Sequence, residues 1–335
     1  MALVMNIALS SSKKMFLPAY VTLTSMFENH QNVCCHAYIL HSELEQEQIE
    51  SFQKLAEKYH GQIIECRVDK ERLAGVREHE RVSVETYYRL FLTDYLPEDA
   101  ERVLVIGTDV IINQNIEEYY NQDFEGKCIV VCKDFLTRKS VLEPEWYVLK
   151  FLREEGYSYF NADVLLYNMH ELRKIDLPGK FFEVEQEFHD LLTIMDQDIL
   201  NYLFYDKVKY VDENLYNFCA RGFFSEEWNY DRVERETKII HYSGPVKPWD
   251  MQEFYCEIEY IWWKYAKKTV LYHEIADQFI KGIILESDVR EYIQTLRNKV
   301  SKLGKEVWEK RQQFFDMRRE VRRLEKELES KNDSF

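Results

Sequence analysis

The stretch VLVIGTDVII, residues 103–112, is an apolar run interrupted once, by a glycine, a threonine and an aspartate. Its apolar part has the length and composition of a buried strand, and the polar break after Ile106 predicts where that strand ends. Asp109 stands inside this apolar surrounding, where an unpaired carboxylate would be costly. It is therefore either a turn or helix-capping acid, or a residue that binds a ligand.

Short apolar runs alternate with helical patterns on both sides of this stretch. We predict strands over residues 3–9, 35–41, 63–68, 102–106, 127–133, 159–167, 207–211 and 238–242, and helices over residues 18–30, 43–59 and 83–95. This order predicts an α/β protein, a Rossmann-like parallel or mixed sheet flanked by helices. Ligands of such sheets bind beyond the carboxyl ends of the strands, which are here residues 10–15 and 107–110.

The composition excludes several classes of protein. The chain has 335 residues, 46% of them hydrophobic, and its 60 acidic and 44 basic side chains give a net charge of -16, which argues against nucleic acid as a partner. Its 10 glycines are too widely spaced for the glycine fingerprint of dinucleotide-binding folds, a P-loop or a nucleophile elbow. Any nucleotide must be held by another device.

The cysteines and the N-terminus bear on the compartment. The 7 cysteines contain no CxxC pair and lie mostly in apolar runs, which predicts reduced, buried thiols. The chain starts without a recognisable secretion signal, and no apolar run is long enough to span a membrane. We therefore expect a cytoplasmic protein, free in solution or at the inner membrane surface.

The stretch IIHYSGPVKPW, residues 239–249, combines three residue types that suit a ligand site. His241 follows a β-branched strand and offers an imidazole suited to Mn²⁺. Gly244 permits close approach of the backbone, and Lys247 supplies a positive charge of the kind that binds phosphates. A lone histidine is more often a core residue, but this combination at three-residue spacing favours a binding site.

Two further stretches carry polar residues at the expected starts of elements. They are YFNADVLLYN, residues 159–168, and MDQDILN, residues 195–201. Asn161 at a strand start, and Asp196 and Gln197 at a helix start, are consistent either with turn and N-cap chemistry or with substrate binding.

In this order, the four stretches resemble glycosyltransferase family 8, over roughly residues 5–255. In the segment VSVETYYRL, Arg89 matches the basic residue that precedes the family's acidic motif. The resemblance implies a GT-A fold, a bound Mn²⁺ or Mg²⁺, and transfer of glucose or galactose from a UDP-sugar with retention at the anomeric carbon. The acceptor would be a glycan or glycoprotein of bacterial glycan assembly.

The resemblance also implies roles for individual residues. Asp109 and His241 would be metal ligands. The donor sugar and nucleotide would be contacted by Ser10, Ser12, Lys14, Arg89, Thr108, Asn161, Gly244 and Lys247. Asp196 and Gln197 would lie beside the transferred sugar, with Gln197 nearest the face opposite the leaving group.

The sequence departs from the family pattern at the metal site and at the first strand. Gly107 replaces the first acid of the family's DxD motif, while Asp163 stands where the family usually has glycine. Near the first strand, Ser12 replaces an acid and is followed by Lys13 and Lys14. Three hypotheses follow: a transferase whose weakened metal site is completed by water or Asp163, a transferase that uses Lys13 or Lys14 instead of metal, and a catalytically silent dimeric scaffold or partner subunit.

The C-terminal region has a different pattern. From residue 289 to 328, positions spaced alternately four and three apart are apolar with the exception of Lys310, which predicts a parallel two-stranded coiled coil and a homodimer. The alternatives are a helix lying on its own domain and, because the helix is rich in Arg and Lys, an amphipathic helix at a membrane surface. We expect a GT-A domain at 1–265, a helical connector at 266–285 and the heptad helix at 286–335.

Overall fold

The computed structural model describes residues 4–73, 84–135, 147–220, 222, 228–244, 247–250, 257–282 and 289–332. Contacts divide the chain into two units, Met1–Asp277 and Gln278–Phe335, which are treated separately. The strands are β1 (Val4–Ser10), β2 (Cys34–His41), β3 (Gln62–Arg67), β4 (Arg102–Ile106), β5 (Val110–Ile112), β6 (Ile129–Lys133), β7 (Phe160–Asn168), β8 (Val208–Val211), β9 (Phe218–Cys219) and β10 (Ile239–His241).

The helices vary from single turns to one very long helix. The α-helices are α1 (Phe16–Glu28), α2 (Gln46–Lys58), α3 (Glu117–Tyr120), α5 (Tyr147–Glu154), α6 (Met169–Leu172), α7 (Leu177–Phe188), α8 (Met195–Phe204), α9 (Glu213–Tyr216), α10 (Tyr230–Glu236), α11 (Glu259–Ala266), α12 (Tyr272–Lys281) and α13 (Val289–Asn332). Three 3-10 helices are η1 (Lys70–Leu73), η2 (Val84–Asp94) and η3 (His189–Leu191).

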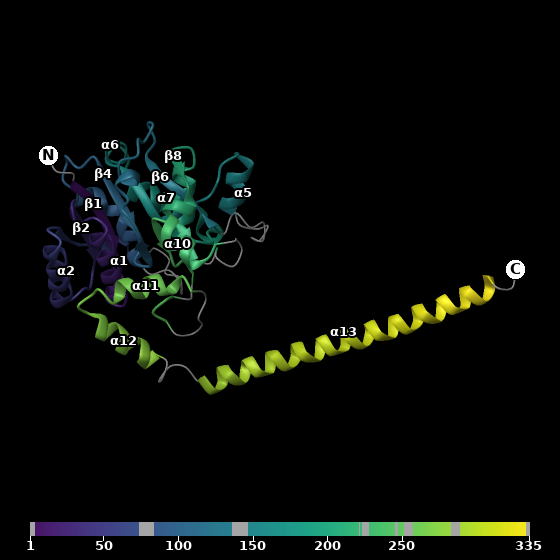
Figure 1. Cartoon of the computed structure of the whole chain (residues 1–335). Helices are drawn as coiled ribbons and strands as arrows, with labels where there is room; N and C mark the ends of the chain where they lie inside the picture. Colours follow the sequence, from purple (N-terminus) through teal and green to yellow (C-terminus); the bar gives the residue numbers. More distant parts are fainter. Residues whose placement is uncertain are drawn as a thin grey trace. The chain divides into compact units, whose positions relative to one another are not determined.

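The first unit is built on a seven-stranded mixed sheet of order β3-β2-β1-β4-β7-β6-β8 (Figure 1). Strands β3, β2, β1 and β4 run parallel, whereas β7 pairs antiparallel with both β4 and β6. Strand β8 is parallel to β6. Six strands therefore point one way, and β7 alone points the other way. The predicted α/β class with a mixed, Rossmann-like sheet is confirmed.

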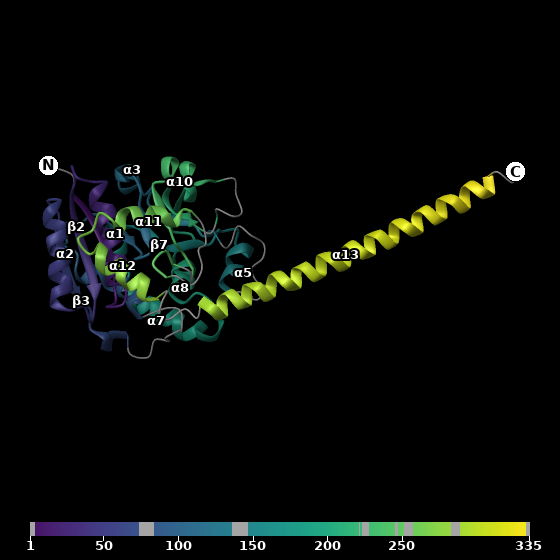
Figure 2. The ribbon, with the colours of Figure 1, turned by 60° about the horizontal axis from the view of Figure 1, so that its bottom comes forward.

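Both faces of this sheet are covered, which explains why its strands are almost continuously apolar. Alternate strand residues such as Ile7 and Leu104 face one side and pack with α1 and α2, which lie together in both ribbon views (Figures 1 and 2). Their neighbours Ala8 and Val103 face the other side, where η2, α7 and α8 pack. The period of two along each strand thus divides the core into two layers.

A second, three-stranded sheet of order β5-β10-β9 extends the first unit. Its core contains Ile111, Ile240 and the fully buried Trp262 of α11, which lies against α1 (Figure 2). Trp249 and Trp263 both have their rings within 5.2 Å of Trp262. These tryptophans therefore pack against one another.

The sequence pattern misjudged two kinds of local structure. The segment predicted as a helix at 83–95 is the 3-10 helix η2 over its described part, because an apolar pattern with Tyr87, Tyr88, Leu90 and Phe91 all buried does not distinguish the two helix types. The short strands β5 and β9 were not predicted either, since 3 and 2 residues give no measurable period.

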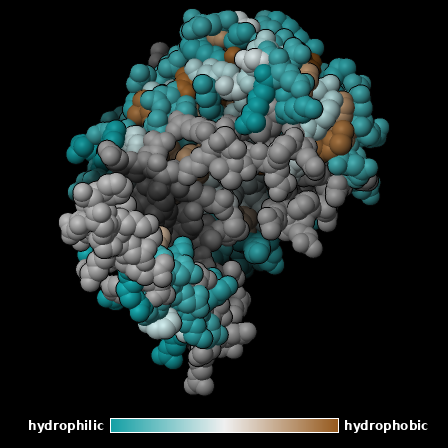
Figure 3. Space-filling view, turned by 90° about the vertical axis from the view of Figure 1, so that its right-hand side faces the viewer, coloured by the Kyte–Doolittle hydropathy of each residue, from teal (hydrophilic) through white to brown (hydrophobic). Residues whose placement is uncertain are grey.

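Of the described cysteines, four are buried and two are partly exposed. Six cysteines are described and none forms a disulfide, while Cys256 lies outside the described residues. Most of the described surface visible in Figure 3 is hydrophilic, with isolated hydrophobic spots. Among the described residues, we find no helix with both the length and the hydrophobicity needed to cross a membrane.

The second unit consists mainly of α13, a continuous helix of 44 residues. Side chains of its heptad seam are exposed, among them Val300 (68%), Val307 (66%) and Val321 (48%). A Cβ atom added at Gly304 would contact none of the described residues. The predicted coiled coil, which needs a second copy, remains a prediction.

Candidate active site

The sheet topology brings most of the predicted site residues to one edge. Ser10 ends β1 and Gly107 follows β4, at the carboxyl ends of parallel strands. Because β7 is antiparallel, its start lies at the same edge, and Ile106 pairs with Val164. Asn161 and Asp163 are therefore next to Gly107 although they begin a strand.

The small sheet brings His241 to Asp109. Strand β10 pairs antiparallel with β5, so that His241 lies opposite Val110. The pairing continues for one further bond, in which the backbone N–H of Tyr242 donates to the carbonyl oxygen of Asp109 over 2.9 Å. The two predicted metal ligands are thus held together by backbone pairing.

Asp109, Asp163 and His241 form a cluster that suits a cation. The Nε2 atom of His241 lies 3.5 Å from Oδ1 of Asp109 and 3.5 Å from Oδ2 of Asp163, and one ligand atom from each residue lies within 4.8 Å of the others. His241 is 2% exposed, and its Nε2 has no hydrogen-bond partner among the described residues. A buried polar atom of this kind, facing two carboxylates, is a group that an ion would satisfy.

Hydrogen bonds fix the orientation of His241. The backbone N–H of Asp163 can only donate, so Oδ1 of Asn161 accepts from it over 3.0 Å. The group of Asn217 that contacts the same Oδ1 at 2.9 Å must then be its Nδ2. This leaves Oδ1 of Asn217 to accept from Nδ1 of His241, 3.0 Å away. A neutral His241 therefore presents the lone pair of Nε2 to the carboxylates, as a metal ligand does.

Lys247 contributes a positive charge to the same cluster. Its Nζ lies 2.5 Å from Oδ2 of Asp109 and 2.9 Å from the carbonyl oxygen of Tyr242. Burial raises the pKa of Asp109, but Lys247 and His241 lower it more, and the net pKa is far below the usual value. The pKa of His241 is lowered by burial and raised by Asp109 and Asp163, with a net increase. Asp109 is accordingly an anion at neutral pH.

The loop before Lys247 has a backbone that requires glycine. Gly244 has a φ of +99°, a conformation that residues with a side chain rarely adopt. Pro245 and Val246 lie outside the described residues. The glycine thus allows this backbone conformation three residues after His241.

Arg89 is the second buried cation of the site. It belongs to η2, is 5% exposed, and donates to the carbonyl oxygens of Thr86 and Ala162. Its guanidinium lies 3.4 Å from Asp163 and 4.0 Å from Asp196. Burial lowers the pKa of Arg89, while the two acids raise it to a net value above normal. Burial raises the pKa of Asp196 to about 7, against the opposing effect of Arg89.

Gln197 is held in a single orientation at the start of α8. Its Oε1 accepts from the backbone N–H of Ala162 over 2.9 Å and from Nδ2 of Asn161 over 3.2 Å. Its Nε2 donates to Oδ2 of Asp134 over 3.2 Å. The next acid, Asp198, accepts from the backbone N–H groups of residues 193 and 194 and stabilises the helix start.

Three residues of this network were missed or undervalued in the sequence. Asp134 directly follows β6, at the carboxyl end of a strand, and this position was a usable signal. Asn217 follows a single helical turn and gives no signal. Asp163 was proposed, as an alternative to water, to complete the metal site, but its place opposite Gly107 was not predicted, because its strand was not recognised as antiparallel.

Several residues predicted to bind the nucleotide, after β1 and after β4, contact neighbouring residues in the structure. Ser12 accepts from the backbone N–H of Met15 through its Oγ, over 3.3 Å, before α1. Lys13 forms an ion pair with Glu45, and Lys14 is exposed. The carbonyl oxygen of Thr108 accepts from Thr22 over 2.9 Å. Ser10, Ser12, Lys14 and Thr108 share the edge of the cluster, and their role in nucleotide binding remains a prediction.

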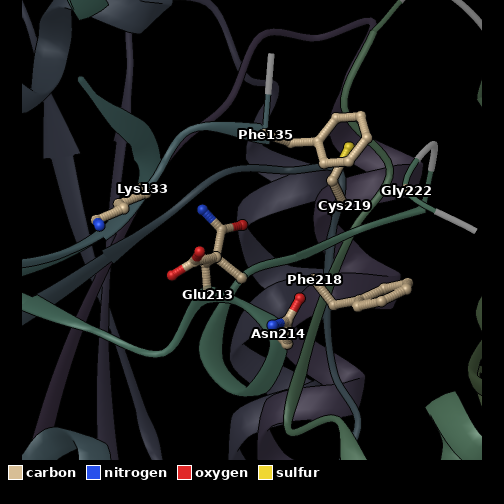
Figure 4. A pocket seen from close by; sticks show the side chains of 8 residues that line it. Lys133, Phe135, Glu213, Asn214, Phe218, Cys219 and Gly222 are labelled. Atoms are coloured by element: carbon tan, nitrogen blue, oxygen red, sulfur yellow. The ribbon is translucent and has the colours of Figure 1, made fainter. Parts of the chain in front are cut away.

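A small pocket adjoins the network at Asn217. Figure 4 shows Phe135, Cys219 and Gly222 on one side of it, with Lys133 and Glu213 on the other. The residues that line the pocket come from the end of β6 and the loop after it, from the α9 to β9 segment, and from Gly222 beyond β9. Asn217 thus connects His241 with a second, partly apolar recess.

Known proteins resemble this chain over its first unit. The family described as "Glycosyl transferase family 8" matches residues 6–253. Glycosyltransferase GlyA of Streptococcus pneumoniae is 26% identical over 76% of this chain, which spans 35% of that longer protein. Lipopolysaccharide 1,3-galactosyltransferase of Salmonella typhimurium is 26% identical over 73% of this chain and 72% of its own length. The chain belongs to glycosyltransferase family 8.

Solved structures support the same fold. The galactosyltransferase LgtC, crystallised in complex with donor and acceptor sugar analogs, matches with a TM-score of 0.70 and 23% identity, over 79% of this chain and 96% of its own. The first unit therefore has the GT-A fold of glycosyltransferases, as the resemblance implied.

Proposed function

We propose that the chain transfers glucose or galactose from a UDP-sugar to a glycan or glycoprotein acceptor, with retention at the anomeric carbon. The observation that carries this proposal is the buried, unpartnered Nε2 of His241, which faces two carboxylates beside Lys247. Relatives that act on bacterial lipopolysaccharide, as a 1,3-galactosyltransferase and a 1,2-glucosyltransferase, support a hexose donor and a glycan acceptor.

We assign Asp109 and His241 to a divalent cation, Mn²⁺ or Mg²⁺, with Mn²⁺ better suited to the imidazole. When bound, such an ion supplies positive charge to the diphosphate as the bond to the sugar breaks. Lys247 would shift from Asp109 to the diphosphate once the ion neutralises Asp109. Gly244 would let the backbone approach the same phosphates.

The residues around Gln197 would hold the sugar. Gln197, Asn161 and Asp134 form a connected, buried set of polar groups at the same sheet edge. Arg89 would keep Asp196 in place and balance its charge. A silent scaffold is the second candidate, favoured by Gly107, but it gives no reason for such a completely connected polar network.

Calorimetric titration with UDP tests this proposal. We expect UDP to bind in the presence of Mn²⁺ and to bind at least tenfold more weakly without it. Lys247→Ala should weaken binding by about 1.5–3 kcal/mol, the value of a hydrogen bond to a charged group. Lys264→Ala, which removes an exposed lysine paired with Glu234, is the control and should bind as the unaltered chain does.

Two other results would favour one of the other hypotheses. Equal UDP affinity with and without Mn²⁺ would favour charge neutralisation by Lys13 or Lys14. Failure of UDP to bind under either condition would exclude both transferase hypotheses and leave the scaffold.

We further propose that α13 pairs with a second copy through residues 289–328. Its exposed apolar seam is the observation that supports a homodimer, and contact of its basic residues with a membrane is the alternative.

Leu303→Glu combined with Val307→Glu should convert a dimer to a monomer in sedimentation, because like charges would meet in the seam. Ser301→Glu adds a charge outside the seam and should leave the dimer intact; a dimer that survives the double change would contradict the assignment.

A further inference from the structure

We propose that Asp163 completes the cation site and that its carboxylate replaces one that position 107 can no longer carry. This inference rests on the proposed cation at Asp109 and His241 and identifies its third protein ligand. It makes Gly107 and Asp163 a coupled pair, because a side chain at position 107 would crowd Asp163 as well as Asp109.

The glycine at position 107 is explained by space and not by backbone conformation. Unlike Gly244, Gly107 has no positive φ, so its backbone would accept other residues. A Cβ atom at this position would lie 2.9 Å from Oδ1 of Asp109, 3.1 Å from Oδ1 of Asp163 and 3.2 Å from its Cβ. Any side chain at 107 would therefore crowd both carboxylates.

The strand register explains how one carboxylate can replace the other. Ile106 pairs with Val164 in the antiparallel ladder of β4 and β7, so the next opposing pair is Gly107 and Asp163. The N–H of Gly107 donates to the carbonyl oxygen of Asp163 over 2.9 Å, which continues the ladder. Side chains of directly opposed residues project from the same face of a sheet. An acid on either strand would reach the same space.

The contacts of Asp163 point toward the cluster. Its Oδ2 lies 3.5 Å from the unpartnered Nε2 of His241, and its Oδ1 lies 3.4 Å from Arg89. The side chain is 33% exposed, so it can exchange contact with water for contact with an ion. One oxygen is thus available to a cation while the other is oriented by Arg89.

A purely structural role, as a counter-ion of Arg89, is the alternative for Asp163. Arg89 retains Asp196 and two carbonyl oxygens without it. The two roles predict different effects of Asp163→Asn, which replaces the carboxylate by an amide of the same shape. If Asp163 is a ligand, the change weakens Mn²⁺ binding, and if it serves only as a counter-ion of Arg89, Mn²⁺ binding is unchanged.

The test measures Mn²⁺ binding to the full chain by electron paramagnetic resonance, without any sugar nucleotide. We expect Asp163→Asn to weaken Mn²⁺ binding at least tenfold. Gly107→Asp combined with Asp163→Gly should return the affinity to within about threefold of the unaltered chain, because the carboxylate is moved across one register pair. Glu183→Gln removes an exposed acid that pairs with Lys180 on α7, and it should leave Mn²⁺ binding unchanged.

Two outcomes would overturn the assignment. One is an Asp163→Asn chain that binds Mn²⁺ as tightly as the unaltered chain, which would exclude Asp163 as a ligand while leaving the cation site itself in place. The other is a double variant that is folded by circular dichroism yet binds no more tightly than Asp163→Asn. If the unaltered chain binds no Mn²⁺, the proposed cation fails, and this inference fails with it.

Discussion

Asp109→Asn is expected to lower the rate of UDP release from UDP-glucose or UDP-galactose by at least about 100-fold. Asp109 contacts both His241 and Lys247, so the substitution removes a metal ligand and the counter-charge of a partly buried lysine together. Loss of an outer-sphere partner of a metal site alone costs about 10–100-fold in affinity or activity, and a direct ligand should cost more. The amide keeps the shape of the acid, so the fold should be retained.

The measurement is the initial rate of UDP release at saturating Mn²⁺, together with circular dichroism to verify folding. Glu118→Gln is the matched control, since it neutralises an exposed acid that pairs with Lys238 at the surface. The control should keep the rate of the unaltered chain. A rate for Asp109→Asn within twofold of the rate of the unaltered chain would show that Asp109 is not a metal ligand.

Arg89→Met is expected to reduce the free energy of unfolding by about 3–5 kcal/mol, the usual cost of removing one partner of a buried ion pair. Arg89 is 5% exposed, and the substitution would leave the buried Asp196 without its cation. Asp196 already has a pKa raised to about 7, and removal of Arg89 should raise this pKa further.

The loss should also depend on pH. An acid whose pKa is higher in the folded than in the unfolded chain binds its proton more tightly when folded, so stability falls as the pH rises from about 4 through the folded pKa. The effect of Arg89→Met should therefore be larger at pH 8 than at pH 5. Urea unfolding followed by tryptophan fluorescence at both pH values measures it.

Two further variants sharpen this test. Asp196→Asn added to Arg89→Met should recover part of the stability and remove most of the pH dependence. Arg232→Met affects an exposed pair with Glu236 and should change stability by less than about 1 kcal/mol. Equal losses for Arg89→Met and Arg232→Met would show that the buried pair contributes no more than a surface one.

Much of the fold could be predicted because its strands have a clear boundary signal. The run that ends at Ile106 and the run that ends at His41 both appear as strands within one residue of their predicted bounds. The direction of β7 could not be predicted, since a residue pattern gives a strand its period but not its partners. The same limit applies to β5 and β9, whose existence depends on pairing with β10.

The site could be predicted where a residue type carries its own chemistry. His241, Lys247 and Asp109 were found for this reason, and they lie within contact distance of one another. Asn217 was missed because an amide that orients a histidine is recognisable only from the geometry. The place of Asp163 opposite Gly107 could not be predicted, because it depends on strand register across 55 intervening residues.

The crowding at Gly107 also limits how this chain can change over generations. The Cβ atom of an acid gained at position 107 would lie 3.1 Å from Oδ1 of Asp163. Loss of the acid at position 163 would leave a carboxylate at neither position. With Asp163 as the proposed third ligand, we expect each single substitution to weaken the cation site and the two together to restore it. The two positions are then expected to be epistatic, with a less fit intermediate on the route between the two arrangements.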